Sequence, residues 1–268
     1  MIFSPLSNKL INIHQLSDEL DSNIFIGGYY LFLDCNESLG VSSKNYAFKL
    51  SSFLIPKNNL KNASKRSSLV HYLIDLEKIE KEDIFSIIKR KKRRYCIRKS
   101  IKDNSLTVVV FGINDIDKNA VYDLYCKSMI RLGEIPKTLK KFFENAHLAN
   151  FICVMHEKKL VACNYLIDAK PFAILCYSFS DPEFWVRNIN ERLYYETIEF
   201  YLKKNYRILD LGPALASDDS HNLFKESFGA KRYSIYEYQN LSLYLKIKIT
   251  VISSNKRFIS FVKRLCLL

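Results

Sequence analysis

The sequence has few of the residues that bend or cross-link a chain, with 7 glycines, 6 prolines and 7 cysteines in 268 residues. The cysteines are odd in number and form no C-x-x-C pair, which argues against a disulfide framework or a zinc site. The five histidines do not cluster either, so we expect no metal site. We therefore expect reduced cysteines in an intracellular protein.

Long apolar runs are also missing. The sequence contains no run of 18 apolar residues, and its start, MIFSPLSNKL, lacks the basic segment and apolar run of a signal peptide. We therefore expect no membrane-spanning helix and a cytoplasmic location. With 48% hydrophobic residues, a chain of this length buries a full core without cross-links.

Acidic residues are scarce in two segments that carry most of the net charge of +13. Residues 81–110 hold ten Lys/Arg against three Asp/Glu, and residues 240–268 hold six against none. Two local patches suit a polyanionic partner, such as tRNA, a nucleotide-linked or lipid-linked precursor, or an anionic lipid surface. The alternative is that both are solvated helix faces. The candidate polyanion contacts are Lys91, Lys92, Arg93, Arg94, Arg98 and Lys99.

The last 15 residues, 254–268, have an apolar stripe beside four cations, which is typical of a basic amphipathic helix. Such a helix either rests on the anionic inner face of a membrane or packs on its own domain. The first alternative predicts a peripheral membrane contact through this segment.

The hydrophobic periodicity predicts an alternation of strands and helices. Residues 56–68 are expected to form a loop, and Lys158 and Lys159 a tight hairpin turn. The expected strands are 23–34, 46–55, 69–76, 106–113, 150–157, 159–168, 171–180, 207–213 and 231–239. The expected helices are 77–101, 117–131, 136–147, 188–204 and one that Ser217 or Asp218 begins and Gly229 ends.

The order of elements over 106–239 is that of the GNAT acyltransferase fold, an α/β (α+β) class with a mixed, mostly antiparallel central sheet. Three segments are similar to the FemAB-like branch of that fold, which includes peptidoglycan cross-bridge aminoacyltransferases and related proteins of polysaccharide loci. The first is the strand and helix ending in Ile97-Arg98-Lys99-Ser100, with Arg94 before it. The second is a helix pair joined by Arg131-x-Gly133, and the third is ILDLGP followed by FKESFG, residues 224–229.

This resemblance covers roughly residues 69–240 and implies three parts. They are a reduced N-terminal GNAT-like unit over 1–80, a GNAT acyltransferase domain over 81–240, and a basic C-terminal strand and amphipathic helix over 241–268. Classical members carry two complete GNAT-like units, whereas about 70 residues precede the first match here.

Lys225 lies between Phe224 and Phe228 on a helix that Gly229 ends. Acyl transfer to an amine needs a positive or hydrogen-bonding group where the oxyanion of the tetrahedral intermediate grows. The resemblance implies that Lys225 faces the reacting ester or the substrate phosphates. The alternative is that its ammonium only snorkels to the surface from an amphipathic helix.

Other candidates follow from position and resemblance. Asp210 ends a strand next to Gly212 and is a candidate to orient the attacking amine or accept its proton, or else a turn residue. Tyr177 and Ser178 end a strand and are candidates to bind the donor acyl group. The remaining candidates for substrate binding are Arg131, for a phosphate or carboxylate, Phe224, and His221, one helical turn before Lys225.

Glycine is absent from YSFSDPEFWVRNINERLYYE, residues 177–196, where a CoA-dependent GNAT enzyme has the glycine-rich turn that binds pyrophosphate. We therefore expect no bound cofactor and an acyltransferase that moves an aminoacyl group from aminoacyl-tRNA to an amine of a cell-envelope or glycan precursor. One alternative is a CoA-dependent N-acyltransferase with a degenerate pyrophosphate loop and acyl-CoA as donor. Another is a non-catalytic nucleic-acid-binding or scaffold protein.

Overall fold

A computed structural model describes residues 69–79, 83–143, 146, 149–168 and 172–233 with their side chains, and several further strands as backbone. The chain divides into two compact units, one of Met1–Ser67 with Ile235–Leu268 and one of Ser68–Ser234. The predicted boundary at residue 80 falls inside the second unit. The predicted C-terminal part, 241–268, lies outside the described residues.

The first unit is described through its strands. β5 pairs with Ile235–Asn240 of β12 in antiparallel fashion and with β3 and β4 in parallel fashion, and β1 pairs with β2 and β4. The bounds are β1 Ile2–Ser4, β2 Lys9–Ile11, β3 Phe25–Ile26, β4 Tyr30–Leu31 and β5 Tyr46–Ser51. Whether these strands form a reduced GNAT-like half stays a prediction.

The second unit is built on a mixed sheet in the order β12-β6-β11-β10-β9-β8-β7. Its strand pairs from β7 to β10, and β11 with β6, are antiparallel, whereas β10 and β11 are parallel. The predicted α/β class with a mostly antiparallel mixed sheet is therefore confirmed. The bounds are β6 Lys65–Asp75, β7 Leu106–Phe111, β8 Ala149–His156, β9 Lys159–Ala169, β10 Phe172–Ser180, β11 Ile208–Leu215 and β12 Lys231–Asn240.

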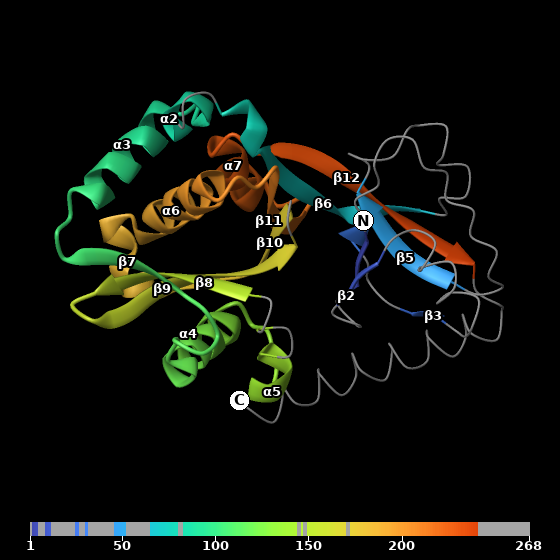
Figure 1. The fold of residues 1–268 in the computed structure, drawn as a ribbon, viewed down its shortest axis with the longest axis horizontal. Coiled ribbons are helices and arrows are strands. Elements are labelled where there is room, and N and C mark those ends of the chain that lie inside the picture. The colour runs from blue at the N-terminus through green and yellow to red at the C-terminus, as the bar shows by residue number, and fades with distance from the viewer. Residues whose placement is uncertain are drawn as a thin grey trace. The chain divides into compact units, whose positions relative to one another are not determined.

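Helices cover both faces of this sheet (Figure 1): α4 and α5 lie on one face, and α3, α6 and α7 on the other. Asp117 and Asp218 begin α4 and α7 by accepting hydrogen bonds from backbone N–H groups of the first turn, at Asn119 and His221 respectively. The bounds are α2 Ile84–Ile87, α3 Lys91–Ile101, α4 Lys118–Arg131, α5 Leu139–Phe142, α6 Ile189–Lys203 and α7 Asp219–Ser227, with short 3₁₀ helices η3 Leu76–Lys78 and η6 Pro182–Arg187.

The single helix predicted over 77–101 is wrong, because the structure has two helices, α2 and α3, with an extended Ile88 after α2. Ile88 is fully buried, and its carbonyl accepts a hydrogen bond from Arg94 Nε at 2.5 Å. Burial of Ile88 in the core thus overrides the local helix propensity. The predicted loop 56–68 is also too long, since β6 begins at Lys65.

In the part of the chain that the structure describes, every helix is too short or too polar to span a lipid bilayer.

Candidate active site

The parallel strands β10 and β11 are both irregular at the same level of the sheet. Their pairing runs from Phe172–Ile208 to Ile174–Asp210. The pairing of β10 with β9 then shifts between Leu175 and Tyr177, and that of β11 with β6 shifts between Asp210 and Pro213. Bulges of this kind re-aim side chains and free backbone groups, and they often accompany active sites.

Gly212 forms the irregularity of β11. Its φ is +77°, a left-handed value that side chains rarely adopt, and a Cβ at this position would lie 2.7 Å from the Leu175 carbonyl oxygen. Glycine therefore allows β11 to turn while it stays against β10.

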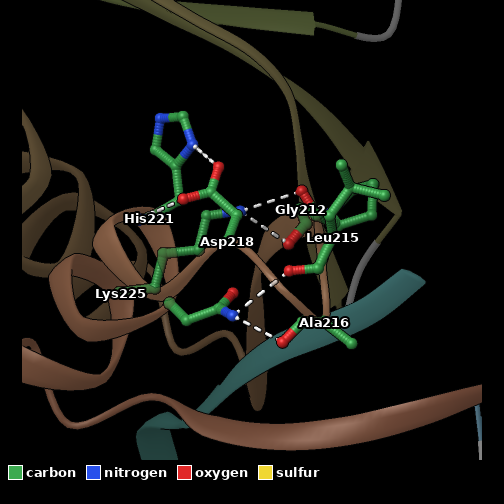
Figure 2. Close-up of polar contacts among 8 residues, drawn as sticks. Gly212, Leu215, Ala216, Asp218, His221 and Lys225 are labelled. Carbon is green, nitrogen blue, oxygen red and sulfur yellow. Dashed lines mark hydrogen bonds and ion pairs between the residues drawn. The ribbon is translucent and has the colours of Figure 1, made fainter. Parts of the chain in front are cut away.

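Lys225 reaches this turn from α7. Its Nζ donates hydrogen bonds to the carbonyl oxygens of Gly212, at 2.9 Å, and Pro213, at 3.1 Å (Figure 2). The side chain is only 7% exposed, so the ammonium does not snorkel to the surface. Burial lowers the pKa of Lys225 from 10.5 to about 8, although the Asp210 and Asp218 carboxylates act in the opposite direction.

Asp210 binds the same glycine through its N–H. Its Oδ1 accepts the Gly212 N–H at 2.8 Å, and its Oδ2 lies 2.6 Å from His71 Nδ1. Both Asp210 and His71 are buried. Gly212 thus lies between the two predicted catalytic residues, because Asp210 binds its N–H, in the peptide group before it, and Lys225 binds its carbonyl, in the peptide group after it.

His221 does not share this contact. Its Nδ1 lies 2.7 Å from Asp218 Oδ2 at the exposed start of α7, apart from the carbonyl contacts of Lys225 (Figure 2). Asn222 instead anchors α7, because its Nδ2 donates to the carbonyl oxygens of Leu215 and Ala216 at 3.1 and 3.2 Å.

Tyr177 and Ser178 point to opposite faces of the sheet, as successive strand residues do. The Tyr177 ring meets Tyr125 of α4 edge-on at 5.4 Å, and its hydroxyl accepts a hydrogen bond from Lys137 Nζ. Ser178 instead hydrogen-bonds Tyr194 of α6, whose pKa is raised by burial. The structure therefore places Ser178 on the α6 face and Tyr177 among the aromatic rings on the α4 face.

Phe224 and Arg131 are held by ring contacts. The Phe224 ring meets Tyr194 edge-on at 5.0 Å and lies under the Arg93 guanidinium at 4.4 Å. The exposed Arg131 lies over the Trp185 ring, 4.9 Å from its centroid.

The basic residues of α3 divide into two groups. Arg93 pairs with Glu191, donates to Ser227 Oγ at 2.9 Å and stacks on Phe224 and Phe228, while Arg94 binds the Ile88 carbonyl. These two arginines hold the fold together. Four members of the predicted polyanion set are exposed: Lys91, Lys92, Arg98 and Lys99.

The connection between β10 and α6 is the 3₁₀ helix η6. Asp181 Oδ1 accepts the Glu183 N–H at 3.2 Å at its start, so a carboxylate already occupies that amide. A second carboxylate, Glu183, lies in the first turn. The connection therefore presents negative charge where a pyrophosphate would need free amides.

Sequence reasoning missed His71, and no local signal identifies it, because its partner Asp210 is 139 positions away. Among the cysteines of β8, β9 and β10, Cys153 and Cys163 are buried with their Sγ atoms 3.6 Å apart, whereas Cys176 is exposed at the irregularity of β10. Across the part of the chain that the structure describes, no three His, Cys, Asp or Glu side chains gather as metal ligands.

Solved structures that share this fold include FemX and two proteins whose names refer to L-PGS or lysylphosphatidylglycerol synthetase. FemX aligns over 78% of this chain and 75% of its own at a TM-score of 0.59 and 11% identity. The C-terminal domain of an Agrobacterium fabrum protein assigned as a lysylphosphatidylglycerol synthetase aligns over 83% and 80% at a TM-score of 0.56 and 14% identity. L-PGS from Bacillus licheniformis aligns over 77% and 72% at 0.53 and 12%.

No family model and no curated protein sequence matches the chain. The predicted resemblance to the FemAB-like branch is thus confirmed by structural similarity, at the level of the fold.

Proposed function

We propose that the chain is an acyltransferase that moves an aminoacyl group from aminoacyl-tRNA to an amine of a cell-envelope or glycan precursor. The observation that carries this proposal is the buried Lys225 ammonium on the Gly212 turn, in a fold shared with FemX and with a protein named for lysylphosphatidylglycerol synthesis. The second name is that of an enzyme that joins lysine to a phospholipid.

Lys225 suits the stabilisation of an oxyanion. Two of its three N–H bonds are fixed on the carbonyls of Gly212 and Pro213, so the ammonium is oriented before substrate binds. With a pKa of about 8, it is mostly charged at neutral pH. The proposed role of the third N–H is to meet the negative charge that grows on the donor carbonyl.

Asp210 suits the proton transfer that accompanies amine attack. Its carboxylate is fixed by His71 and the Gly212 N–H, so its position is set without substrate. We assign it the role of drawing the proton from the attacking amine, with His71 as its orienting partner.

The donor assignment follows from charge. The β10–α6 connection begins with Asp181 and Glu183, which disfavours the pyrophosphate of acyl-CoA. The exposed cations of α3 suit an RNA backbone instead. Binding to tRNA is then expected to weaken steeply as salt is raised.

The test follows radiolabel from a charged tRNA pool into acid-stable products in the presence of an envelope precursor extract. We expect wild-type protein to transfer label and Lys225→Met to be at least ~100-fold slower, which is the usual loss for one oxyanion donor. The matched control is Lys204→Met, an exposed lysine at the end of α6, which should keep wild-type activity.

Two results would contradict the proposal. Transfer from acyl-CoA but not from aminoacyl-tRNA would establish the CoA-dependent alternative. Salt-sensitive tRNA binding without transfer from either donor would indicate a non-catalytic nucleic-acid-binding protein.

A further inference from the structure

Five large apolar side chains are exposed around the C-terminal end of α4. They come from the last turn of α4, the loop after it and η6, and we call them the α4 tip. Their exposed fractions are Ile130 67%, Leu132 53%, Ile135 52%, Trp185 42% and Val186 80%.

The two segments of the α4 tip are joined by Arg131, whose guanidinium lies over the Trp185 ring. The inward face of α4 is already complete without the tip, because Val121, Leu124 and Tyr125 are buried there. The core therefore does not require large apolar residues at the tip. Exposed apolar groups of this size usually mark a binding surface.

The α4 side of the tip is rich in cations, whereas the η6 side begins with the carboxylates of Asp181 and Glu183. Between residues 127 and 141 one acidic residue, Glu134, stands against five exposed basic residues. Exposed apolar side chains next to several exposed cations, with a tryptophan among them, are the composition that anionic membrane surfaces attract. The five are Lys127, Arg131, Lys137, Lys140 and Lys141.

Other occupants fit this surface less well. The chain's own segment 254–268 carries four cations and no acidic residue, so the charge of the tip repels it. A nucleic acid would match the cations, but stacking of bases needs an open aromatic face, and Arg131 lies over the Trp185 ring.

We infer that the α4 tip docks on the surface of an anionic lipid bilayer, with Ile130, Leu132 and Val186 entering the headgroup region. The inference concerns a surface distinct from the Lys225 contact, and it holds whether or not the proposed acyl transfer does. Lys137, in the loop between α4 and α5, links this surface to Tyr177 of β10.

Tryptophan fluorescence can measure this contact, because Trp185 is the one tryptophan in the sequence. We expect phosphatidylglycerol vesicles to shift the Trp185 emission to shorter wavelength, and lipids brominated near the headgroup to quench it. Phosphatidylcholine vesicles should do neither, and added salt should weaken the response.

Flotation of the full chain with phosphatidylglycerol vesicles gives the affinity. The variant Ile130→Ser/Leu132→Ser/Val186→Ser should bind at least about tenfold more weakly, since returning one such side chain to water changes affinity about tenfold. The control Ile101→Ser/Leu223→Ser removes exposed apolar residues of α3 and α7 and should bind like wild type. Equal melting temperatures would exclude misfolding as the cause.

Several results would overturn the inference. They are wild-type affinity in the triple variant, absence of wild-type binding to phosphatidylglycerol, and binding without any change in Trp185 emission. Loss of binding in Phe258→Ser/Phe261→Ser but not in the triple variant would assign the membrane contact to the C-terminal segment. Loss of tRNA binding in the triple variant, with lipid binding intact, would assign the tip to RNA.

Discussion

Replacement of Lys225 by methionine should change how the free energy of unfolding depends on pH. Methionine keeps the length and most of the volume of the side chain but has no ionisable group. In wild type, the pKa of Lys225 is about 8 in the folded state, because the group is buried, and 10.5 in the unfolded chain. Between these values the unfolded chain binds a proton that the folded protein does not.

The sign and size follow from linkage. Wild-type stability should rise, relative to Lys225→Met, as pH increases from 8 to 10.5, because the unfolded state binds more protons there. Each pH unit is worth about 1.4 kcal/mol, so the full gain is about 3 kcal/mol. Below pH 8 the difference between the two proteins should be constant.

Urea unfolding at pH 7, 8, 9 and 10.5, followed by circular dichroism, measures this difference. Other groups that titrate in this range contribute equally to both proteins and cancel. Lys92→Met, which removes an exposed lysine of α3, should give a flat difference from wild type. A flat difference for Lys225→Met as well would mean that Lys225 titrates normally, and the argument for a buried, oriented ammonium would be refuted.

Four further outcomes are expected. Gly212→Ala should lower the free energy of unfolding by about 2 kcal/mol or more in urea, because a side chain strains a backbone with φ of +77° and meets a carbonyl of β10. Asp210→Asn should lower the pKa of Lys225 further, since the carboxylate raises it; an NMR titration of ¹³C-labelled lysine measures this, and an unchanged value would contradict it. Arg93→Met should cost about 1–3 kcal/mol of stability because it leaves Glu191 partly buried without its partner. Lys92→Met should leave stability within about 0.5 kcal/mol but weaken tRNA binding and reduce its salt dependence.

Most elements of the second unit were predictable because their signals are local. As expected, α4 begins after Asp117 and α7 begins after Asp218, and each aspartate precedes an apolar pattern with helical spacing. The interruption between α2 and α3 was not predictable, since no glycine or proline marks it. Burial of Ile88, a tertiary effect, causes it.

The candidate site was predictable in part. Asp210 and Lys225 stand in recognisable motifs, but their contacts with the N–H and the carbonyl of Gly212 depend on the turn at that residue. The partner of Asp210, His71, is an ordinary strand residue in the sequence. Arg93 was indistinguishable from its basic neighbours until its contacts with Ser227 and Phe224 were seen.

In the FKESFG segment, the packing of the chain requires the glycine that ends α7, whatever the role of the lysine. Gly229 has φ of +85°, and a Cβ there would lie 2.8 Å from both the carbonyl oxygen and the Cβ of Ile87. Any chain that brings these two helices equally close must keep a residue without a side chain at this point, whether or not it is an enzyme. In distant sequences, a glycine at this point thus reports shared packing, and it says nothing of the catalytic role proposed for the lysine four positions earlier.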